Sequence, residues 1–598
     1  MNQLGPRLVL ALALAFSGCE DDPTIDGGPE GDASTAAEGG TTMDAAPPPQ
    51  DAGPIDCQTA VEGEGWSFCS ANAATCEFVF RDSTGCGAAC AELGLACVDA
   101  REDIDDMCAP RDDLPALGCA DNGHISDYCI CGRAPPPDAG PGDAGPMGDA
   151  GPAGPVLAFP SARGAGAYAT GGRGGRVIRV TTLANAGPGS LREALTATGP
   201  RIIVFAVSGT IPITSSIIVT EGDFTLAGQT APEGGITLTG GSRVIEFREV
   251  SNFILRYVRV RPEYSSFDAV RFTDCDNFIA DHMSVSFGGD EIMSSTRDTD
   301  DVTFQRTLFG EGKTGTLFGD SDDPALSENL SFHHNAYYNV THRHPNMHSF
   351  GRVDHYNNVV FNWRFRWSVV IGDVSLNHMN NYYSQGCLTS PSGTNSFNKI
   401  FYRAAYQPEL HSAGNLVMPS FFTDPSASNA PLWSWRVDVT EGPYAGAGAN
   451  TPLTTDYFVD MPFPLLGPPA VVQSATEAFV DVTGDVGAGS RVTETGTVVA
   501  ERDALDTLYL DNIRAGDCVE YMSSSAGQDF DSTPHYAAFR ATISETPVAM
   551  GPTDADEDGM PDTWESSMGF DASLDDSALD ADGDGYTNIE EFINRVDG

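Results

Sequence analysis

Two acidic segments near the end of the chain have the residue spacing of metal-binding loops. They are DADEDGMPDTWE, which starts at Asp554, and DADGDGYTNIEE, which starts at Asp580. Each segment has oxygen-bearing side chains at loop positions one, three, five, nine and twelve, and glycine at position six. Six or seven hard oxygen ligands around a sharp turn suit Ca²⁺, because this ion accepts flexible, oxygen-only coordination. We therefore expect tandem Ca²⁺-binding loops in residues 551–598.

The loop positions also predict which side chains would hold each ion. The expected side-chain ligands are Asp554, Asp556, Asp558, Asp562 and Glu565 in the first loop and Asp580, Asp582, Asp584, Asn588 and Glu591 in the second. Gly559 and Gly585 would permit the turn, while Met560 and Tyr586 would offer backbone carbonyls. The loops resemble bacterial extracellular calcium repeats related to dockerins and thrombospondin type-3 units, which implies a structural or attachment role. A merely acidic tail is the alternative.

A second candidate for chemistry is the stretch from Leu330 to Trp363, LSFHHNAYYNVTHRHPNMHSFGRVDHYNNVVFNW. Strand-like runs stand at both of its ends, and a polar loop between them contains Arg343, Pro345 and His348. A loop held between rigid strands is a good position for a reactive group. What this stretch can do depends on the elements that position it.

Short β-branched and aromatic runs recur from Leu157 onward, separated by glycine, asparagine, aspartate and serine. The run FILRYV starts at Phe253, and the similar run FIADHM starts at Phe278. Asparagine recurs at equal intervals at Asn335, Asn358 and Asn381. A period in the low twenties with asparagine at one turn favours a parallel β-helix over a sandwich or barrel, and stacked asparagines can form hydrogen-bonded ladders. We expect this all-β fold over residues 157–550, with final coils and peripheral loops after Ser390.

The beginning of the chain has the pattern of an export signal. Residues 1–19 contain Arg7, the apolar run LVLALALAF and then Ser17-Gly18-Cys19, an ending that looks like a bacterial lipoprotein box. Cys19 would then be lipidated, and an ordinary cleaved signal is the alternative. No other apolar run is long enough to span a bilayer. We expect a monomeric, exported protein that is either lipid-anchored at the cell surface or outer membrane, its only membrane contact, or secreted.

Two segments rich in glycine, proline, alanine and aspartate, residues 20–56 and 134–156, predict a disordered stalk and a linker. Residues 57–133 between them contain ten cysteines. In an exported chain this density predicts a disulfide-rich accessory module, which could bind carbohydrate, and a metal cluster is the alternative. The remaining cysteines after the signal are Cys275, Cys387 and Cys518. Three is an odd number, so at least one is free or paired outside this part of the chain.

The chain has 84 acidic and 32 basic side chains and a formal net charge of −52. This charge excludes a general affinity for nucleic acid or for an anionic membrane surface. It also means that any polyanionic substrate would need cations gathered at its binding site.

Seven motifs together support a family resemblance over roughly Leu157 to Gln385. In chain order they are AFPSARGAGAYATGGRGG, GSLREAL, VFAVSGTI, LAGQTAP, NFIADHMSVS, NLSFHHN and RHPNMH. They resemble the pectate lyases of polysaccharide lyase family one. The resemblance implies a right-handed parallel β-helix that cleaves pectate, an acidic plant-type polysaccharide, by β-elimination.

The resemblance also implies roles for individual residues. Arg343 would be the base that removes the C5 proton, and Lys313 would hold the uronate. His348, which also would bind the substrate, stands where the family has a second arginine. An arginine base has a pKa above about 12, so activity is expected to rise towards alkaline pH. The alternative for Arg343 is a structural role, paired with an acidic side chain.

In the cleft the resemblance implies Ca²⁺ ligands at Asp268 and Asp290. Ser266 and Ser294 stand where two further acids are usual, so this calcium site is depleted. Glu291 could compensate, but neighbouring residues on a strand point to opposite faces, so we expect it to point away from Asp290.

Two other functions compete with the lyase hypothesis. A non-catalytic surface glycan-binding protein would use the same groove, and another uronan-active β-helix enzyme, such as a hydrolase or epimerase, is the third option. Hydrolysis needs two carboxylates facing one cleft, for which Asp268 and Asp290 are the only obvious pair. We expect Asp281 and His282 to stabilise a rung of the helix rather than to act as half of a catalytic triad. The histidines expected to be ladder or turn residues are His333, His334 and His355.

Overall fold

The computed structural model describes two parts of the chain. The first part comprises residues 67–71, 75–79, 90, 96–101, 103–104, 107–110 and 128–132. The second runs from 155 to 597 without residues 242, 264–266, 320–326, 388, 390–396, 420, 469–470 and 519–547. The expected signal peptide and stalk, and all but two residues of the expected linker, lie outside the described residues. None of the described helices has the length and apolar character needed to cross a membrane.

The chain divides into two compact units, residues 1–149 and 150–598. In the first unit the described strands form a four-stranded antiparallel sheet, β1-β2-β6-β3, and a two-stranded pair, β4-β5. Cys69, Cys90 and Cys129 are disulfide-bonded. The side chains of the other seven cysteines lie outside the described residues, so the ten-cysteine framework stays a prediction. The strands are β1 (Ser67–Ala71), β2 (Thr75–Val79), β3 (Ala96–Arg101), β4 (Asp103–Ile104), β5 (Met107–Pro110) and β6 (Tyr128–Gly132).

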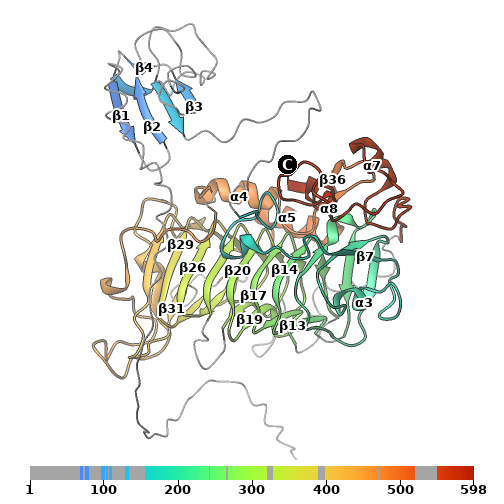
Figure 1. Cartoon of the computed structure of the whole chain (residues 1–598). Coiled ribbons are helices and arrows are strands. Elements are labelled where there is room, and N and C mark those ends of the chain that lie inside the picture. The colour runs from blue at the N-terminus through green and yellow to red at the C-terminus, as the bar shows by residue number, and fades with distance from the viewer. Residues whose placement is uncertain are drawn as a thin grey trace, which may run out of the picture. The chain divides into compact units, whose positions relative to one another are not determined.

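The second unit is a parallel β-helix, which confirms the predicted core (Figure 1). Nine described coils each contribute one strand to each of three parallel sheets, and one of these sheets has a further strand. Sheet 1 has nine strands, β10 (Ile217–Val219), β13 (Ile245–Arg248), β16 (Val270–Thr273), β19 (Glu291–Thr296), β22 (Thr314–Phe318), β25 (Asn346–His348), β28 (Val369–Ile371), β31 (Asn398–Ile400) and β34 (Trp433–Trp435).

The other two sheets complete each coil. Sheet 2 contains β7 (Arg176–Val180), β8 (Arg201–Phe205), β11 (Phe224–Ala227), β14 (Ser251–Arg256), β17 (Asp276–Asp281), β20 (Asp300–Gln305), β23 (Glu328–His333), β26 (Gly351–Tyr356), β29 (Val374–Met379) and β32 (Glu409–Ala413). Sheet 3 contains β9 (Gly209–Pro212), β12 (Ile236–Thr239), β15 (Arg259–Val260), β18 (Ser284–Val285), β21 (Leu308–Phe309), β24 (Ala336–Tyr338), β27 (Val359–Phe361), β30 (Tyr382–Ser384) and β33 (Leu416–Met418).

The interior of the β-helix is filled by stacked apolar side chains. Phe224, Phe253 and Phe278 occupy one register position on three successive coils. Their ring centroids are 5.3 Å apart for the first pair and 4.5 Å apart for the second. The offset between Phe253 and Phe278 seen in the sequence is therefore one turn of the helix, and burying such rings is a main source of its stability.

The predicted asparagine ladder is present at the turn between sheets 2 and 3. The Nδ2 group of Asn335 donates to Oδ1 of Asn358 at 3.1 Å, and that of Asn358 donates to Oδ1 of Asn381 at 3.0 Å. The ladder continues through Asn415 to Asn429. All five asparagines are buried, so each rung satisfies polar groups that would otherwise be unpaired inside the protein.

Helices cover one flank of the β-helix, a feature that the expectation of an all-β domain missed. Helices α4 (Ala475–Gly484) and α5 (Ala504–Ala515) pack on sheet 3, with Val482 and Tyr509 among the buried apolar side chains (Figure 1).

A disulfide joins Cys387 to Cys518, and Cys275 is free and buried. The odd cysteine count had indicated such a free thiol.

The C-terminal segment packs on sheet 2. Its helices are α7 (Asp562–Met568) and α8 (Asn588–Ile593), and Trp564 and Phe592 share an apolar cluster with Ile202 and Val204. The remaining elements are η1 (Ala165–Tyr168), α3 (Leu191–Leu195), η2 (Gly228–Thr230), η3 (Ala430–Leu432), η4 (Thr455–Tyr457), β35 (Ser490–Val492), β36 (Val498–Ala500) and η6 (Asn594–Asp597).

Candidate active site

Five successive coils carry a charged residue in the turn that leads into sheet 1. This charged row consists of Asp268, Asp290, Lys313, Arg343 and Arg366, which precede β16, β19, β22, β25 and β28, respectively. Backbone hydrogen bonds between these turns hold them side by side, for example from Thr316 N to Arg343 O at 2.8 Å and from His344 N to Trp367 O at 2.7 Å. Along the helix axis the charge therefore changes from two acids to three cations.

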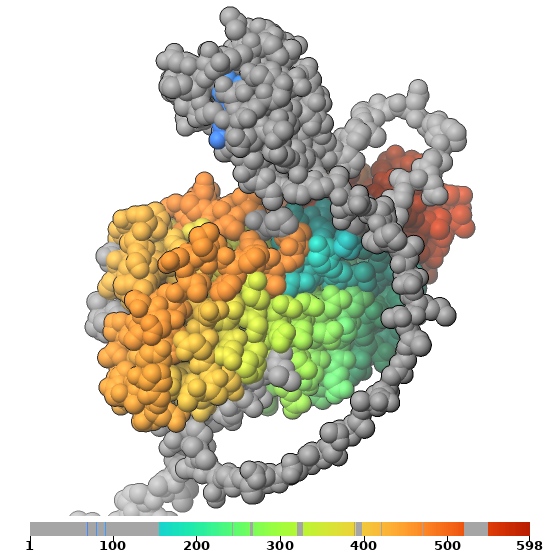
Figure 2. Space-filling view, turned by 60° about the vertical axis from the view of Figure 1, so that its left-hand side comes forward, coloured from blue at the N-terminus to red at the C-terminus, as the bar shows by residue number. Residues whose placement is uncertain are grey.

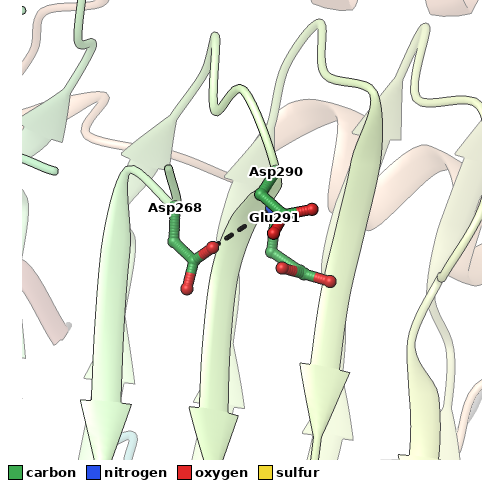
Figure 3. Close-up of side chains that lie close together, drawn as sticks. All are labelled: Asp268, Asp290 and Glu291. Carbon is green, nitrogen blue, oxygen red and sulfur yellow. Dashed lines mark hydrogen bonds between the residues drawn. The ribbon is translucent and has the colours of Figure 1, made fainter. Parts of the chain in front are cut away.

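The acidic end of the row contains a third carboxylate. Asp268, Asp290 and Glu291 each place a carboxylate oxygen within 4.8 Å of the others (Figure 3). The expectation that Glu291 would point away from Asp290 is wrong, because Asp290 lies in the turn before β19 and strand alternation does not apply to it. We call these three residues the acid group.

Asp268 is the most strongly held member of the acid group. Its carboxylate accepts hydrogen bonds from Ser294 Oγ at 2.6 Å and from Glu291 N at 3.3 Å. Burial raises the pKa of Asp268, and the Ser294 hydrogen bond and Arg271 oppose this rise. Ser294 therefore positions the Asp268 carboxylate, which the sequence analysis predicted as a ligand, while Ser266 lies outside the described residues. Three carboxylates this close fit a divalent cation, since a cation would relieve their mutual repulsion.

Arg343 donates a hydrogen bond to Glu291, and the two form an ion pair. The acid lies two coils away, so the Arg343 side chain extends along the charged row past the coil of Lys313. Arg343 has a left-handed backbone conformation, with φ of 67°, which it shares with many other turn residues of this β-helix, including Arg297 and Arg306. From the sequence, the alternative for Arg343 was a structural ion pair with an acidic side chain. This ion pair is present, and the acidic partner, Glu291, belongs to the acid group.

Lys313 and His348, the two expected substrate-binding residues, differ in accessibility. Lys313 is exposed and makes no ion pair with any residue that the structure describes. His348 lies on β25 with 6% of its surface exposed. A small, buried imidazole cannot reach as far as the arginine that the family has at this position.

The histidines for which the sequence analysis expected structural roles, His282, His333, His334 and His355, are buried in the β-helix. His355 stacks on His378 inside the β-helix with ring centroids 5.4 Å apart. Asp281 is fully buried and binds Arg256 at 2.8 Å and His282 Nδ1 at 2.9 Å. Burial alone would lower the pKa of His282, but Asp281 outweighs it and raises the pKa to about 9.

The two C-terminal loops share the turn geometry that their spacing predicts. Asp554 Oδ2 accepts from Gly559 N, and Asp580 Oδ2 accepts from Gly585 N, both at 3.0 Å. The two glycines have φ of 91° and 101°, in the region that favours glycine. The position-nine side chains, Asp562 and Asn588, each accept from the backbone at position two.

Buried carboxylates in the first loop fit a bound cation. Asp558 and Glu565 are 1% and 0% exposed, and carboxylate oxygens of Asp554, Asp556, Asp558 and Glu565 have no hydrogen-bond partner among the described residues. Burial, reinforced by the neighbouring acids, raises the pKa of Asp558 to about 7 and that of Glu565 to about 8. Unpaired charges in such a position are unfavourable unless a metal neutralises them.

The second loop is more open. Asp580, Asp582 and Asp584 approach within 4.8 Å of one another but are exposed. Burial and Asp584 raise the pKa of Glu591 to about 7.

Asp576, which the sequence analysis did not select, approaches Asp558 and Glu565 within 4.8 Å. It lies between the two loops and outside both spacing patterns, so no local motif marked it.

Sequence reasoning also missed Arg366. A signal was available, because the interval from Arg343 to Arg366 equals the interval between the ladder residues Asn335 and Asn358. One coil of the repeat therefore places the second arginine beside the first.

The chain is similar to known proteins in both sequence and structure. A family model described as pectate lyase matches residues 234–396. The probable pectate lyase C of Aspergillus terreus is 32% identical over 459 residues, covering 74% of this chain and 94% of that protein. The probable pectate lyase C of Aspergillus flavus is 31% identical over 452 residues, with the same coverage. The crystal structure of the major allergen from cedar pollen is 17% identical and matches with a TM-score of 0.41, covering 54% of this chain and 92% of that one.

Proposed function

The chain belongs to the pectate lyase family, and we propose that it cleaves polygalacturonate by β-elimination at the charged row of sheet 1. The observation that carries the proposal is the order of charges along the row, from the acid group to Lys313 and Arg343. A uronan chain lying along the helix axis would meet carboxylate ligands and cations in turn.

The difficult step of this reaction is removal of the proton at C5. That proton is only weakly acidic while the adjacent carboxylate keeps its full negative charge, so the site must neutralise the carboxylate as charge develops. Lys313 is suited to this role, because it is exposed and no described acid pairs with it. We propose Arg343 as the base, in the turn next to that of Lys313.

The acid group would hold Ca²⁺, and this ion would add positive charge beside the substrate carboxylate. Glu291 contacts Arg343 through Oε1, so its second carboxylate oxygen could still serve as a ligand. A Ca²⁺ ion bound there would weaken the attraction of Glu291 for Arg343, which could then turn towards the substrate. The ion pair therefore links the acid group to the proposed base.

The test is the ultraviolet absorbance of the unsaturated product on polygalacturonate, from neutral to alkaline pH, with and without Ca²⁺. We expect Arg343→Ala to lower kcat by about 10²–10⁴-fold, the usual contribution of a positioned base. Arg297→Ala is the matched control, because Arg297 follows the far end of β19 and pairs with Asp274 at 3.3 Å. No absorbance rise under any of these conditions, or an Arg343→Ala variant as active as the control, would refute the proposal.

The ion pair also favours a second candidate, a non-catalytic glycan-binding protein, because an arginine held by a carboxylate keeps its proton. Such a protein would retain pectate without shortening it. Product analysis on a panel of uronans separates binding, hydrolysis and elimination, since only elimination leaves a double bond.

We further propose the roles of the parts outside the cleft. The C-terminal loops would bind Ca²⁺ and stabilise the end of the protein, which is supported by the buried carboxylates of the first loop. The N-terminal pattern supports export with lipidation at Cys19, or secretion, and residues 57–133 would form a disulfide-rich accessory module. Mass spectrometry of the mature N-terminus after membrane fractionation tests the lipid anchor.

A further inference from the structure

One acidic side chain between the two C-terminal loops approaches the first of them. Asp576 places a carboxylate oxygen within 4.8 Å of carboxylate oxygens of Asp558 and Glu565, which stand at positions five and twelve of the first loop. All three belong to the C-terminal segment, residues 551–597, which is seen in red in Figure 2. Asp576 lies outside both loop patterns, so the packing of the segment has brought it to the first loop.

The carboxylates that Asp576 meets lack protein partners. Asp558 and Glu565 are 1% and 0% exposed, and Asp558 Oδ2 and both carboxylate oxygens of Glu565 have no hydrogen-bond partner in the described part of the chain. Among the ion pairs of that part, one reaches an acid of the first loop, between Arg179 and Asp554 at 3.2 Å. Buried like charges this close are unfavourable without a counterion, and a divalent cation with oxygen ligands supplies one.

Asp576 also contacts the second loop, through the residue at its position nine. The Nδ2 group of Asn588 donates to the backbone oxygen of Asp576 at 3.0 Å and to its Oδ1 at 3.3 Å. Oδ1 of Asn588 in turn accepts from Ala581 N, at position two of the second loop. A carboxylate can accept several contacts at once, so Asp576 can bind an ion and keep this one. One side chain thus touches both proposed ion sites.

The backbone that follows Asp576 holds the start of α8. Asn588 N donates to Leu579 O at 2.7 Å, and Ile589 N donates to Ser577 O at 3.2 Å. Both amides belong to the first turn of α8, where a helix leaves its N–H groups without partners of its own. Helix α8 carries the expected position-twelve ligand of the second loop. The position of Asp576 therefore fixes the position of that loop.

The second loop is more open than the first. Asp580, Asp582 and Asp584 are exposed, and Asp580 and Asp584 accept backbone hydrogen bonds from within the loop. Calcium affinity rises with the number of ligand charges and with the rigidity of the site. The first loop has Asp576 as an additional carboxylate, and its ligands are more buried, so we expect it to fill first.

We propose that Asp576 is a further Ca²⁺ ligand of the first loop and couples this site to the second loop. Asp576, held at the first loop, would keep Asn588 and the start of α8 in place, so the second loop binds its ion with a smaller loss of conformational entropy. The two loops therefore fill cooperatively and in order. This inference rests on the proposal that the loops bind Ca²⁺ and does not depend on the lyase activity.

Tb³⁺ luminescence can follow the second loop by itself. Tyr586 stands at position seven of this loop, so light absorbed by its ring sensitises a Tb³⁺ ion bound there in place of Ca²⁺. The emission that is lost in Tyr586→Phe belongs to the second loop, because ions bound elsewhere contribute equally to both proteins. The Tb³⁺ concentration at half of this emission measures the affinity of the second loop.

Asp576→Asn should raise that Tb³⁺ concentration about tenfold, within the usual range of coupling between two sites, although it changes no ligand of the second loop. The substituted amide keeps a carbonyl oxygen that can still accept from Asn588, so the segment should keep its fold. Asp575→Asn is the matched control, because Asp575 is the exposed neighbour and its carboxylate accepts from Ser577. Equal midpoints in Asp576→Asn and the wild type, or an equal shift in the control, overturn the proposal.

A double-variant cycle separates coupling from a purely structural role of Asp576. Asp558→Asn disables the first loop and should shift the midpoint of the second loop at least as far as Asp576→Asn does. Because Asp576 acts through the first site, combining the two substitutions should shift the midpoint no further. Shifts that add would show that Asp576 supports the second loop directly, which overturns the coupling and leaves Ca²⁺ binding by the loops standing. An absence of Tyr586-dependent emission in the wild type would refute ion binding by the second loop, and this inference with it.

Discussion

Arg343 reaches past the coil of Lys313 to pair with Glu291, so the proposed base and a proposed calcium ligand neutralise each other. The two side chains are 25% and 7% exposed, which limits the access of water to the pair. In the proposed mechanism, Ca²⁺ and Arg343 would therefore compete for the negative charge of Glu291.

Glu291→Gln should change the calcium response of the activity. Loss of one carboxylate from the acid group should raise the Ca²⁺ concentration for half-maximal activity about tenfold, the equivalent of roughly 1.4 kcal/mol of binding. Titration of activity with Ca²⁺ measures the shift. Glu246→Gln is the control, because Glu246 is also buried on sheet 1 but pairs with Arg243 and Arg248. A calcium response equal to that of the control would contradict the role of Glu291.

His282 should make the folded protein less stable as pH rises. Its folded pKa of about 9 lies above the usual value of 6.5, so its stabilisation is complete below about pH 6.5 and is lost as pH passes about 9. Each unit of this difference corresponds to roughly 1.4 kcal/mol. Urea unfolding between pH 6 and pH 9.5 should show the decline, and His282→Gln should flatten it.

His333→Gln is a suitable comparison for that measurement. Burial keeps the pKa of His333 well below 6.5, so this histidine is neutral in the folded protein over the same range and neutral in both states above about pH 7.5. A decline that persists in His282→Gln would show that another group is responsible. The proposed activity rises in the direction in which this stability falls, so rates should be measured before inactivation sets in.

Removal of calcium should loosen the C-terminal segment before the β-helix. Asp558 and Glu565 would be left buried without a counterion, and Trp564 and Phe592 pack on sheet 2 only while the loop is folded. We expect a chelator to lower Tm and to expose residues 551–597 to proteolysis, with recovery on adding Ca²⁺. Asp558→Asn should reproduce the effect, while Asp571→Asn, an exposed acid outside the loop positions, should not. Unchanged proteolysis after chelation would rule out the role of the ion.

The disulfide between Cys387 and Cys518 should stabilise the contact between the late coils and the end of α5. It closes a loop with a sequence separation of 131 residues, for which the loss of chain entropy in the unfolded state corresponds to roughly 4–5 kcal/mol. In a Cys387→Ser, Cys518→Ser double variant the β-helix should unfold at lower denaturant concentration, and this midpoint should no longer respond to reductant, whereas the disulfides of the first unit still would. Cys275→Ala, which removes the buried free thiol, should keep the response.

Periodic features of the fold could be predicted from the sequence because each coil repeats the same physical requirement. Phe253 and Phe278 fill one core position, and Asn335 and Asn358 satisfy one turn, so spacing alone revealed both. The turn glycines of the two C-terminal loops follow from local chemistry in the same way. Helix α4 was not predicted, although Ser474 and Glu477 form a capping box at its start. Only one short face of this helix is buried, so its apolar period is difficult to recognise in the sequence.

The site was harder to predict, because its contacts join different coils. Arg343 and Glu291 are 52 residues apart, and only the stacking of coils brings them together. Strand alternation gave the wrong direction for Asp290 because the strand begins one residue later. Asp576 has no motif around it and is brought to Asp558 by tertiary packing alone.

The asparagine ladder leaves coil length free to vary. Asn335, Asn358 and Asn381 are separated by 23 residues, yet the next rung, from Asn381 to Asn415, bridges a separation of 34 residues with the same amide contact. Part of the additional length lies between β30 and β31, on the side of the coil where the charged row stands. Insertions there leave the rungs in register, so turns of this kind can diversify during evolution, and with them the choice of glycan, without a new fold.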